Sequence, residues 1–154
     1  MAFKAGFVGL IGLPNAGKSS FLNNVLGETL AIVSHKPQAT RKRVQGIVTS
    51  ERAQIVFVDA PGFLQKGKNA MLKFIAEESR QVIKDVDAVL LLVPGDDVSS
   101  ETLLPLVELI KSEKKPWALC VTKRDLKASP TLEGCLAFAR LEGAAIFNYS
   151  VKDP

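Results

Sequence analysis

The sequence predicts a three-layer α/β fold: a mostly parallel six-stranded sheet with one antiparallel edge strand, and helices on both faces. Short apolar runs alternate with longer segments of helical periodicity, which is the pattern of repeated βαβ units. Two apolar runs, 44–49 and 53–58, are separated by only three polar residues and predict an antiparallel hairpin. With 154 residues, the chain is long enough for a single domain with a substantial core.

The first elements follow from the hydrophobic pattern. Residues 5–11 are continuously apolar, as in a strand that is buried on both faces. A helix is predicted at 17–26, with Gly27 as its C-cap. The apolar face of this helix consists of Phe21, Leu22, Val25 and Leu26. The segment 28–43 shows only weak periodicity, so we interpret it as a mobile loop before the hairpin.

The second half of the chain alternates helices with single strands. The predicted strands are 88–93, 117–121 and 144–147. The predicted helices are 69–84, a helix from Ser99 or Ser100 to about 112, and a helix from Ser129 or Thr131 to about 141. The hydroxyl residues at these starts are the expected N-caps. Pro105 predicts a kink or a late start of its helix, because proline removes a helical hydrogen bond.

The composition favours a folded protein in a reducing, cytoplasmic setting. The chain is 47% hydrophobic and 23% charged. Its net charge of +4 suits an anionic ligand or a nucleic-acid surface, but a charge this small usually serves solubility alone. Cys120 and Cys135 lack metal or disulfide spacing, and Cys120 lies in an apolar run as a small core residue would. Secretion is rejected because signal cleavage near Ala16 would destroy the motif described next. No apolar run approaches the ~20 residues that a transmembrane helix needs.

Residues 12–19, Gly-Leu-Pro-Asn-Ala-Gly-Lys-Ser, match the P-loop pattern between a strand and a helix. Gly12 and Gly17 allow close backbone approach, so that N–H groups converge on phosphate oxygens at a helix N-terminus. Lys18 adds a positive charge for the outer phosphates, and the Ser19 hydroxyl is placed to ligate Mg²⁺. The predicted phosphate-binding residues are Asn15, Ala16, Gly17, Lys18, Ser19 and Ser20.

Two further motifs also follow the carboxyl ends of predicted strands, where an open α/β sheet binds its ligands. In Asp59-Ala-Pro-Gly62, the carboxylate can hold Mg²⁺ through water, and the backbone N–H of Gly62 can approach a γ-phosphate. The alternative, a strand-end Asp with a Pro-Gly turn, is disfavoured after a P-loop.

In Thr122-Lys123-Arg124-Asp125, the carboxylate of Asp125 can accept hydrogen bonds from both N1–H and the exocyclic amine of guanine, whereas adenine offers no such donor pair. The stem of Lys123 can lie across the base. A charged surface turn is the competing interpretation.

With these motifs, and with Lys-Pro-Gln-Ala-Thr-Arg-Lys-Arg at 36–43 and Ser-Val-Lys at 150–152, the sequence resembles the Era group of bacterial ribosome-assembly GTPases. The resemblance spans essentially the whole chain and implies a P-loop GTPase G domain. It implies that Thr40 ligates Mg²⁺ and senses the γ-phosphate. It also implies that Ser150, with the Val151 backbone N–H, contacts guanine O6, and that Asn15 helps to hold K⁺.

The departures from the family pattern are Ala60, Thr122 and Val151, and Val151 replaces an alanine whose contact comes from the backbone. Ala60 replaces the usual threonine beside Asp59, a position that adds little to metal binding. Thr122 replaces the usual asparagine of the base motif; its hydroxyl can make one of the tethering bonds that an amide makes, which predicts weaker affinity for the base. At Phe63 the sequence agrees with the Era group, which is normally apolar there. Phe63 stands where signalling GTPases have the glutamine that orients the attacking water. A phenyl ring cannot orient water, which predicts slow intrinsic turnover.

The predicted function is that of a Mg²⁺-dependent GTP-binding switch that hydrolyses GTP to GDP, with small ribosomal subunit assembly implied by resemblance only. The alternatives are an ATP-using P-loop enzyme, a nucleotide-dependent binding module with negligible hydrolysis, and a GTPase of the tRNA-modification or double-G-domain type. The basic run 41–43 could contact phosphate or RNA, but a solvated loop face is favoured because no aromatic residues are interleaved.

The family resemblance also predicts what would follow residue 154. A further helix would cover part of one sheet face, and a KH-type RNA-binding domain would come after it. Neither is present in this sequence, which is therefore expected to be a single G domain truncated before its last helix. On this interpretation, contact with ribosomal RNA cannot be assigned to these residues.

Overall fold

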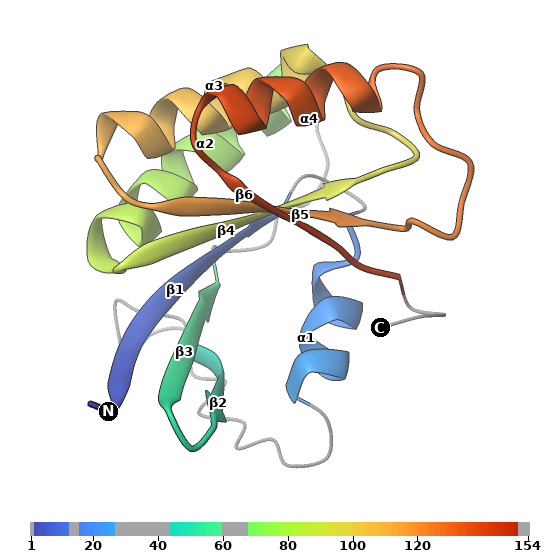
Figure 1. The fold of residues 1–154 in the computed structure, drawn as a ribbon. Helices are drawn as coiled ribbons and strands as arrows, with labels where there is room; N and C mark the ends of the chain where they lie inside the picture. Colours follow the sequence, from blue (N-terminus) through green and yellow to red (C-terminus); the bar gives the residue numbers. More distant parts are fainter. Residues whose placement is uncertain (1, 13–15, 27–43, 60–67, 151–154) are drawn as a thin grey trace.

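A computed structural model describes residues 2–12, 16–26, 44–59 and 68–150 (Figure 1). The strands are β1 (Lys4–Gly12), β2 (Val44–Thr49), β3 (Ala53–Asp59), β4 (Ala88–Pro94), β5 (Trp117–Thr122) and β6 (Ala145–Asn148). The helices are α1 (Lys18–Leu26), α2 (Lys68–Asp85), α3 (Ser100–Ser112) and α4 (Leu132–Leu141). The predicted elements are therefore all present within one or two residues of their expected bounds.

The strands form one sheet in the order β2-β3-β1-β4-β5-β6. Only the pairing of β2 with β3 is antiparallel, and the four other pairings are parallel. Helices α2, α3 and α4 cover one face of the sheet, whereas α1 lies on the opposite face (Figure 1). The predicted three-layer α/β fold with an antiparallel edge strand is confirmed.

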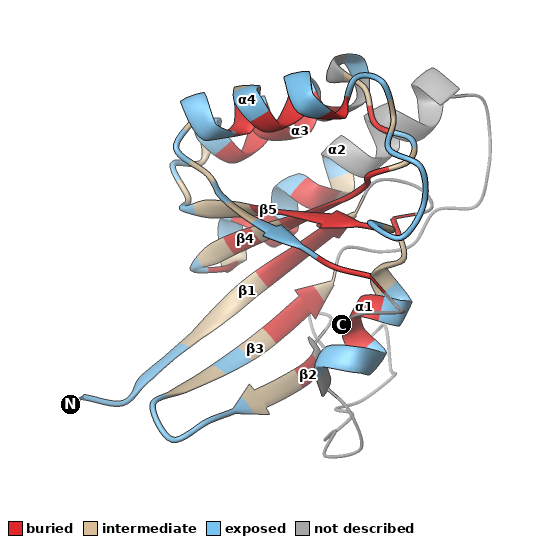
Figure 2. Cartoon of the chain, turned by 45° about the vertical axis from the view of Figure 1, so that its right-hand side comes forward, coloured by how far each residue is buried: buried red, intermediate tan, exposed pale blue. Residues whose placement is uncertain are grey.

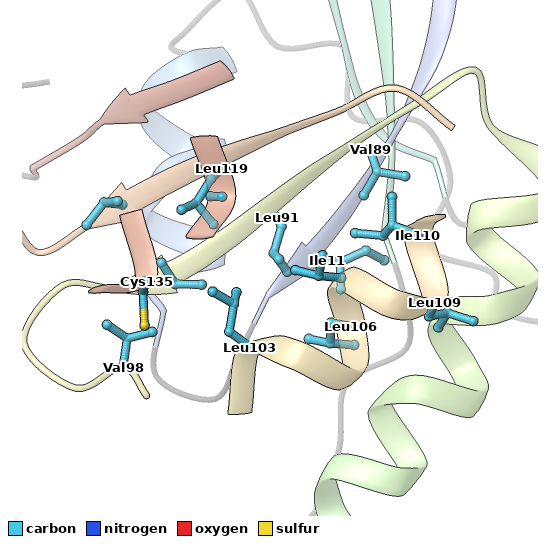
Figure 3. Close-up of a cluster of buried hydrophobic side chains, with 14 of the residues drawn as sticks. Ile11, Val89, Leu91, Val98, Leu103, Leu106, Leu109, Ile110, Leu119 and Cys135 are labelled. Carbon is cyan, nitrogen blue, oxygen red and sulfur yellow. The ribbon is translucent and has the colours of Figure 1, made fainter. Parts of the chain in front are cut away.

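A core lies on each face of the sheet. The larger core packs β1, β4 and β5 against α2, α3 and α4, and Figure 3 shows Ile11 and Leu91 meeting Leu106 and Ile110 of α3. The smaller core lies on the α1 face and consists of Leu10, Ala16, Phe21, Leu22, Phe57, Leu92, Cys120 and Tyr149. Burial raises the pKa of the Cys120 thiol to about 11, so the thiol stays protonated at neutral pH. Its assignment as a core residue is confirmed.

Burial corrects two expectations about the first strand and the first helix. The strand β1 is buried only toward its carboxyl end, because Lys4 and Ala5 are exposed while residues 9–11 are buried (Figure 2). Burial of the whole strand on both faces was therefore wrong. In α1, Phe21 and Leu22 are buried as expected, but Val25 is 38% exposed. Among the side chains of α1 whose burial is described, the core therefore receives Phe21 and Leu22 but not Val25.

Two helix starts also differ from expectation. The helix α3 begins at Ser100 with Pro105 in its interior, so a late start is wrong. At α4, Thr131 occupies the N-cap position, but its hydroxyl makes no capping bond. Instead it donates to the Val98 carbonyl, which Ser129 Oγ also bonds at 3.2 Å. These hydroxyls fix the segment before α4 to the turn after β4. The C-cap predicted at Gly27 and the loop predicted at 28–43 lie outside the described residues.

Candidate functional site

The carboxyl ends of the parallel strands meet at one edge of the sheet, and the predicted motifs follow these ends. In the register of β1 with β3, Leu10 lies beside Asp59, and in that of β1 with β4, Gly12 lies beside Leu92. The strands β5 and β6 extend the same edge with the same polarity. Residues that are far apart in sequence are thereby brought to one side of the molecule, as an open α/β sheet requires of a binding site.

The phosphate-side motifs are joined by an ion pair. Lys18 is the first residue of α1, and its Nζ donates to Asp59 Oδ1 at the end of β3. The two side chains are only 24% and 14% exposed. Just before them, Gly17 has a φ of +75°, a left-handed conformation that glycine adopts at little cost, and its carbonyl accepts from Phe21 N at 2.9 Å. The turn at Gly17 therefore begins α1 so that Lys18 faces Asp59.

The base-side motifs are joined by a hydrogen bond. Ser150 Oγ donates to Asp125 Oδ1 at 2.8 Å, which brings together two residues that the sequence placed in separate motifs. Thr122 is buried, and its hydroxyl donates to the Val93 carbonyl at 3.2 Å. Lys123, the next residue, has a φ of +56°, so the backbone turns sharply at the end of β5. The orientation of the Asp125 carboxylate is thus fixed by Ser150, which lies in the segment that follows β6.

Gly95 supports this turn, a role that sequence reasoning missed because it indicated only a generic Pro-Gly turn here. Its N–H donates to the Thr122 carbonyl at 2.9 Å, and its own carbonyl accepts from Ser129 N at 2.8 Å. A β-carbon at this position would lie 2.9 Å from Val121 Cγ1 and 3.1 Å from the Thr122 oxygen. Only glycine allows the turn after β4 to pass so close to the end of β5. The Pro-Gly pair at the end of a strand was the available signal.

The remaining predicted site residues divide into two groups. Ala16 is buried beneath the start of α1, while Ser19 and Ser20 lie exposed in its first turn. Four residues lie outside the described residues, and their roles stay predictions: Asn15, Thr40, Gly62 and Val151. The same holds for Ala60 and Phe63. Among the described helices, none is long and apolar enough to pass through a bilayer.

This α/β sheet, with a Gly-x-x-x-x-Gly-Lys-Ser motif between β1 and α1, defines a P-loop nucleotide-binding domain. More specifically, the chain belongs to the 50S ribosome-binding GTPase family, whose model matches residues 7–123. Membership of this GTPase family implies GTP binding and hydrolysis.

Solved structures of similar fold include two of Era. A variant of Aquifex aeolicus Era bound to GDP and AlF4⁻ is 29% identical, with a TM-score of 0.69. Era in complex with MgGDPNP and nucleotides 1506–1542 of 16S ribosomal RNA is also 29% identical, with a TM-score of 0.68. Each match covers 97% of this chain but 52% of the Era chain, so the present chain spans about half the length of these proteins.

The fold likeness is not restricted to Era. The G domain of the T. maritima FeoB iron transporter is 21% identical with a TM-score of 0.64, and the match covers 96% of this chain and 88% of that one. At this identity the likeness concerns the fold alone. The findings therefore establish a GTPase-family domain, while the narrower Era assignment is not singled out.

Proposed function

We propose that residues 1–154 form one G domain that binds GTP with Mg²⁺ and hydrolyses it to GDP and phosphate at the sheet edge described above. One observation supports this most strongly. The Lys18–Asp59 pair and the Asp125–Ser150 pair lie at the carboxyl ends of strands in one parallel sheet. The first pair has the chemistry to hold phosphates and a metal, and the second has the chemistry to hold guanine.

On the phosphate side, Lys18 and the N–H groups of residues 16–20 would bind the phosphate oxygens. The carboxylate of Asp59 and the hydroxyl of Ser19 are hard oxygen donors, as Mg²⁺ prefers, so these residues would hold that ion together with Thr40. Bound there, Mg²⁺ would neutralise charge on the transferred phosphoryl group. In the structure the Lys18 ammonium neutralises the Asp59 carboxylate. When nucleotide and Mg²⁺ are bound, Lys18 would instead contact phosphate oxygens and Asp59 would contact the metal.

On the base side, Asp125 would accept hydrogen bonds from guanine N1–H and the 2-amine, with Ser150 Oγ fixing the orientation of the carboxylate. The Val151 N–H would donate to O6, and the stem of Lys123 would cover one face of the base. The hydroxyl of Thr122 already bonds β4 through the Val93 carbonyl. This hydrogen bond takes the place of one bond that the side chain of the usual asparagine would make. It supports the proposal that the guanine site forms although Thr122 replaces asparagine.

Thr40 and Gly62 would hold their two loops while the γ-phosphate is present, and hydrolysis would release them. Catalysis would come from positioning and electrostatic stabilisation by Lys18, Thr40, Gly62 and Asn15, because Phe63 cannot orient water. Slow intrinsic turnover follows. A domain that binds nucleotide with negligible hydrolysis is the second candidate, favoured by the same Phe63.

The 29% identity to Era supports a role in small ribosomal subunit assembly, in which ribosomal RNA or the subunit would be the partner. The fold likeness to FeoB leaves a different GTPase of this class as the alternative. A cytoplasmic location belongs to this proposal, since a reducing compartment would keep the buried cysteines Cys120 and Cys135 in the thiol form.

The nucleotide preference and the turnover test this function together. We expect GTP to displace fluorescent GDP at least about 100-fold more effectively than ATP, because adenine leaves the Asp125 carboxylate unpaired. Single-turnover phosphate release should be slow alone and faster with small ribosomal subunits. Strong competition by ATP would contradict guanine selection. Absence of phosphate release under both conditions would favour the binding module. If small ribosomal subunits do not accelerate phosphate release, the proposed role in ribosome assembly is wrong.

The K⁺ hypothesis has its own test. We propose that K⁺, held with the help of Asn15, supplies the positive charge that an arginine finger gives in other GTPases, a contribution of about 10³-fold or more. Hydrolysis by the wild type should therefore be faster in K⁺ than in Na⁺ at equal ionic strength. Asn15→Ala should abolish this difference while retaining GDP affinity. Equal rates for both proteins in both salts would refute the hypothesis.

A further inference from the structure

Tyr149, the single tyrosine of the chain, lies between the two halves of the proposed site. It follows β6 directly and is only 8% exposed. Its ring packs edge-on against Phe21 of α1, with the ring centroids 5.3 Å apart and the planes at 80°. The ring therefore belongs to the core on the α1 face, together with Phe57 and Cys120. Packing alone would account for an aromatic residue here, but not for its hydroxyl.

The hydroxyl of Tyr149 uses both of its hydrogen-bonding functions on α1. It accepts from Asn24 Nδ2 and donates to the Ser20 carbonyl at 3.3 Å. Ser20 and Asn24 are four residues apart, so they lie one turn from each other on the same face of the helix. A phenol has one donor and can accept in return, and both capacities are satisfied here. The segment after β6 is thus bonded to the helix that begins at Lys18.

The backbone of Tyr149 bonds the base-side motif. Its N–H donates to the Val121 carbonyl at 2.8 Å, and its carbonyl accepts from Arg124 N at 3.4 Å. The next residue is Ser150, whose hydroxyl holds the Asp125 carboxylate at 2.8 Å. One residue therefore contacts the phosphate-side helix through its side chain and the base-side turn through its main chain.

We propose that Tyr149 is a positioning residue that fixes the spacing between the phosphate-binding and base-binding halves of the site. The inference rests on the proposed function, since the two halves are assigned by it. A nucleotide spans both halves, so it binds best when they are already held at the right separation. Without the hydroxyl, the segment containing Ser150 loses its bonds to α1, and part of the binding free energy is spent on ordering it. The Asp125 carboxylate then loses orientation as well.

Tyr149→Phe tests this with the least structural change, because it keeps the ring against Phe21 and removes only the hydroxyl. We expect GDP affinity to fall about three- to tenfold, the range that one hydrogen bond of ordinary strength gives. We also expect the preference for GDP over IDP to fall. Inosine lacks the exocyclic amine, so this ratio measures how well Asp125 is oriented toward that amine. A residue that only stabilises the core would lower the thermal midpoint and leave the ratio unchanged.

Two further variants define the origin of the effect. Ser112→Ala is the matched control: it removes a hydroxyl that donates to a backbone carbonyl, Leu109 O at 2.7 Å, but on α3 across the sheet. It should leave both affinity and ratio unchanged. Asn24→Ala removes the side-chain amide that donates to the Tyr149 hydroxyl. Its effect on GDP affinity should not add to that of Tyr149→Phe in the double variant, because both substitutions break the same contact.

The outcomes separate this inference from the proposed function. A wild type that binds GDP and prefers it to IDP, with a Tyr149→Phe variant of equal affinity and equal ratio, would overturn the positioning role alone. Additive effects of the Tyr149 and Asn24 substitutions would also overturn it, because they would not act through one contact. A folded wild type that binds neither GDP nor IDP would overturn the proposed function and this inference with it.

Discussion

Asp125→Asn is expected to convert the preference for guanine into a preference for xanthine nucleotides. An amide presents one acceptor and one donor where the carboxylate presents two acceptors. Guanine offers two adjacent donors, so one of them meets the amide N–H₂ and GDP affinity should fall about 100-fold or more. Xanthine has an oxygen in place of the exocyclic amine, and it should pair with both groups of the amide.

Ser150 is placed to hold this new amide in the orientation that xanthine needs. Ser150 Oγ donates to Asp125 Oδ1, and the amide oxygen of asparagine can accept that same bond, whereas its nitrogen cannot. If Ser150 keeps donating to this oxygen, the nitrogen takes the place of the second carboxylate oxygen, where it can donate to the 2-oxygen of xanthine. Ser150→Ala in the Asp125→Asn background should then reduce XDP affinity, because the amide is no longer held in one of its two orientations.

Competition of GDP, XDP and ADP against a fluorescent nucleotide measures this exchange. Asp97→Asn is the matched control, since it makes the same chemical change at an exposed carboxylate in the nearby turn after β4. It should leave all three affinities unchanged. A guanine preference that survives Asp125→Asn would refute the assignment of Asp125, and equal losses for GDP and XDP would indicate general damage to the turn.

The sequence predicted those features that depend on local pattern and on strand polarity. Apolar runs and short linkers fixed the order of strands and helices, and the rule that parallel strands end at one edge brought Asp59 to the same side as the P-loop. The assignment of Cys120 to the core followed from its apolar neighbours. These inferences need no knowledge of side-chain geometry.

Other features depend on contacts between distant segments, which a pattern does not encode. Tyr149 lies just before the Ser-Val-Lys motif, and nothing in the local sequence indicates that its hydroxyl bonds a helix more than a hundred residues earlier. Gly95 is required by how closely its turn passes the end of β5, not by a positive φ of its own. Thr131 failed as a capping residue because a tertiary partner, the Val98 carbonyl, competes for its hydroxyl.

Lys18→Ala is expected to have the largest effect on turnover. The ammonium is the charged side chain of the P-loop, and removing one preorganised donor to a developing charge lowers turnover by about 100- to 1,000-fold. GDP and GTP affinity should fall as well, since a charged hydrogen bond contributes about 1.5–3 kcal/mol. The loss should be greater for GTP, because Lys18 is assigned to the outer phosphates.

The ion pair with Asp59 lets this effect be separated from a loss of stability. Both partners are part-buried, at 24% and 14% exposure, so Lys18→Ala leaves a carboxylate without this partner and costs some stability in the absence of nucleotide. That cost should be small beside the loss of ligand stabilisation. A nucleotide at 100 times its dissociation constant adds about 2.7 kcal/mol to the free energy of unfolding, and this increment should largely disappear in the variant.

Thermal unfolding with and without saturating Mg²⁺-GDP, together with single-turnover hydrolysis, measures both quantities. Lys111→Ala is the control, because it removes the lysine of another ion pair, that of Lys111 with Glu142 between α3 and the end of α4. It should change neither the nucleotide-induced stabilisation nor the rate. If Lys18→Ala keeps the full thermal shift and the wild-type rate, the ammonium does not contact the nucleotide. The pair with Asp59 would then serve only to join α1 to β3.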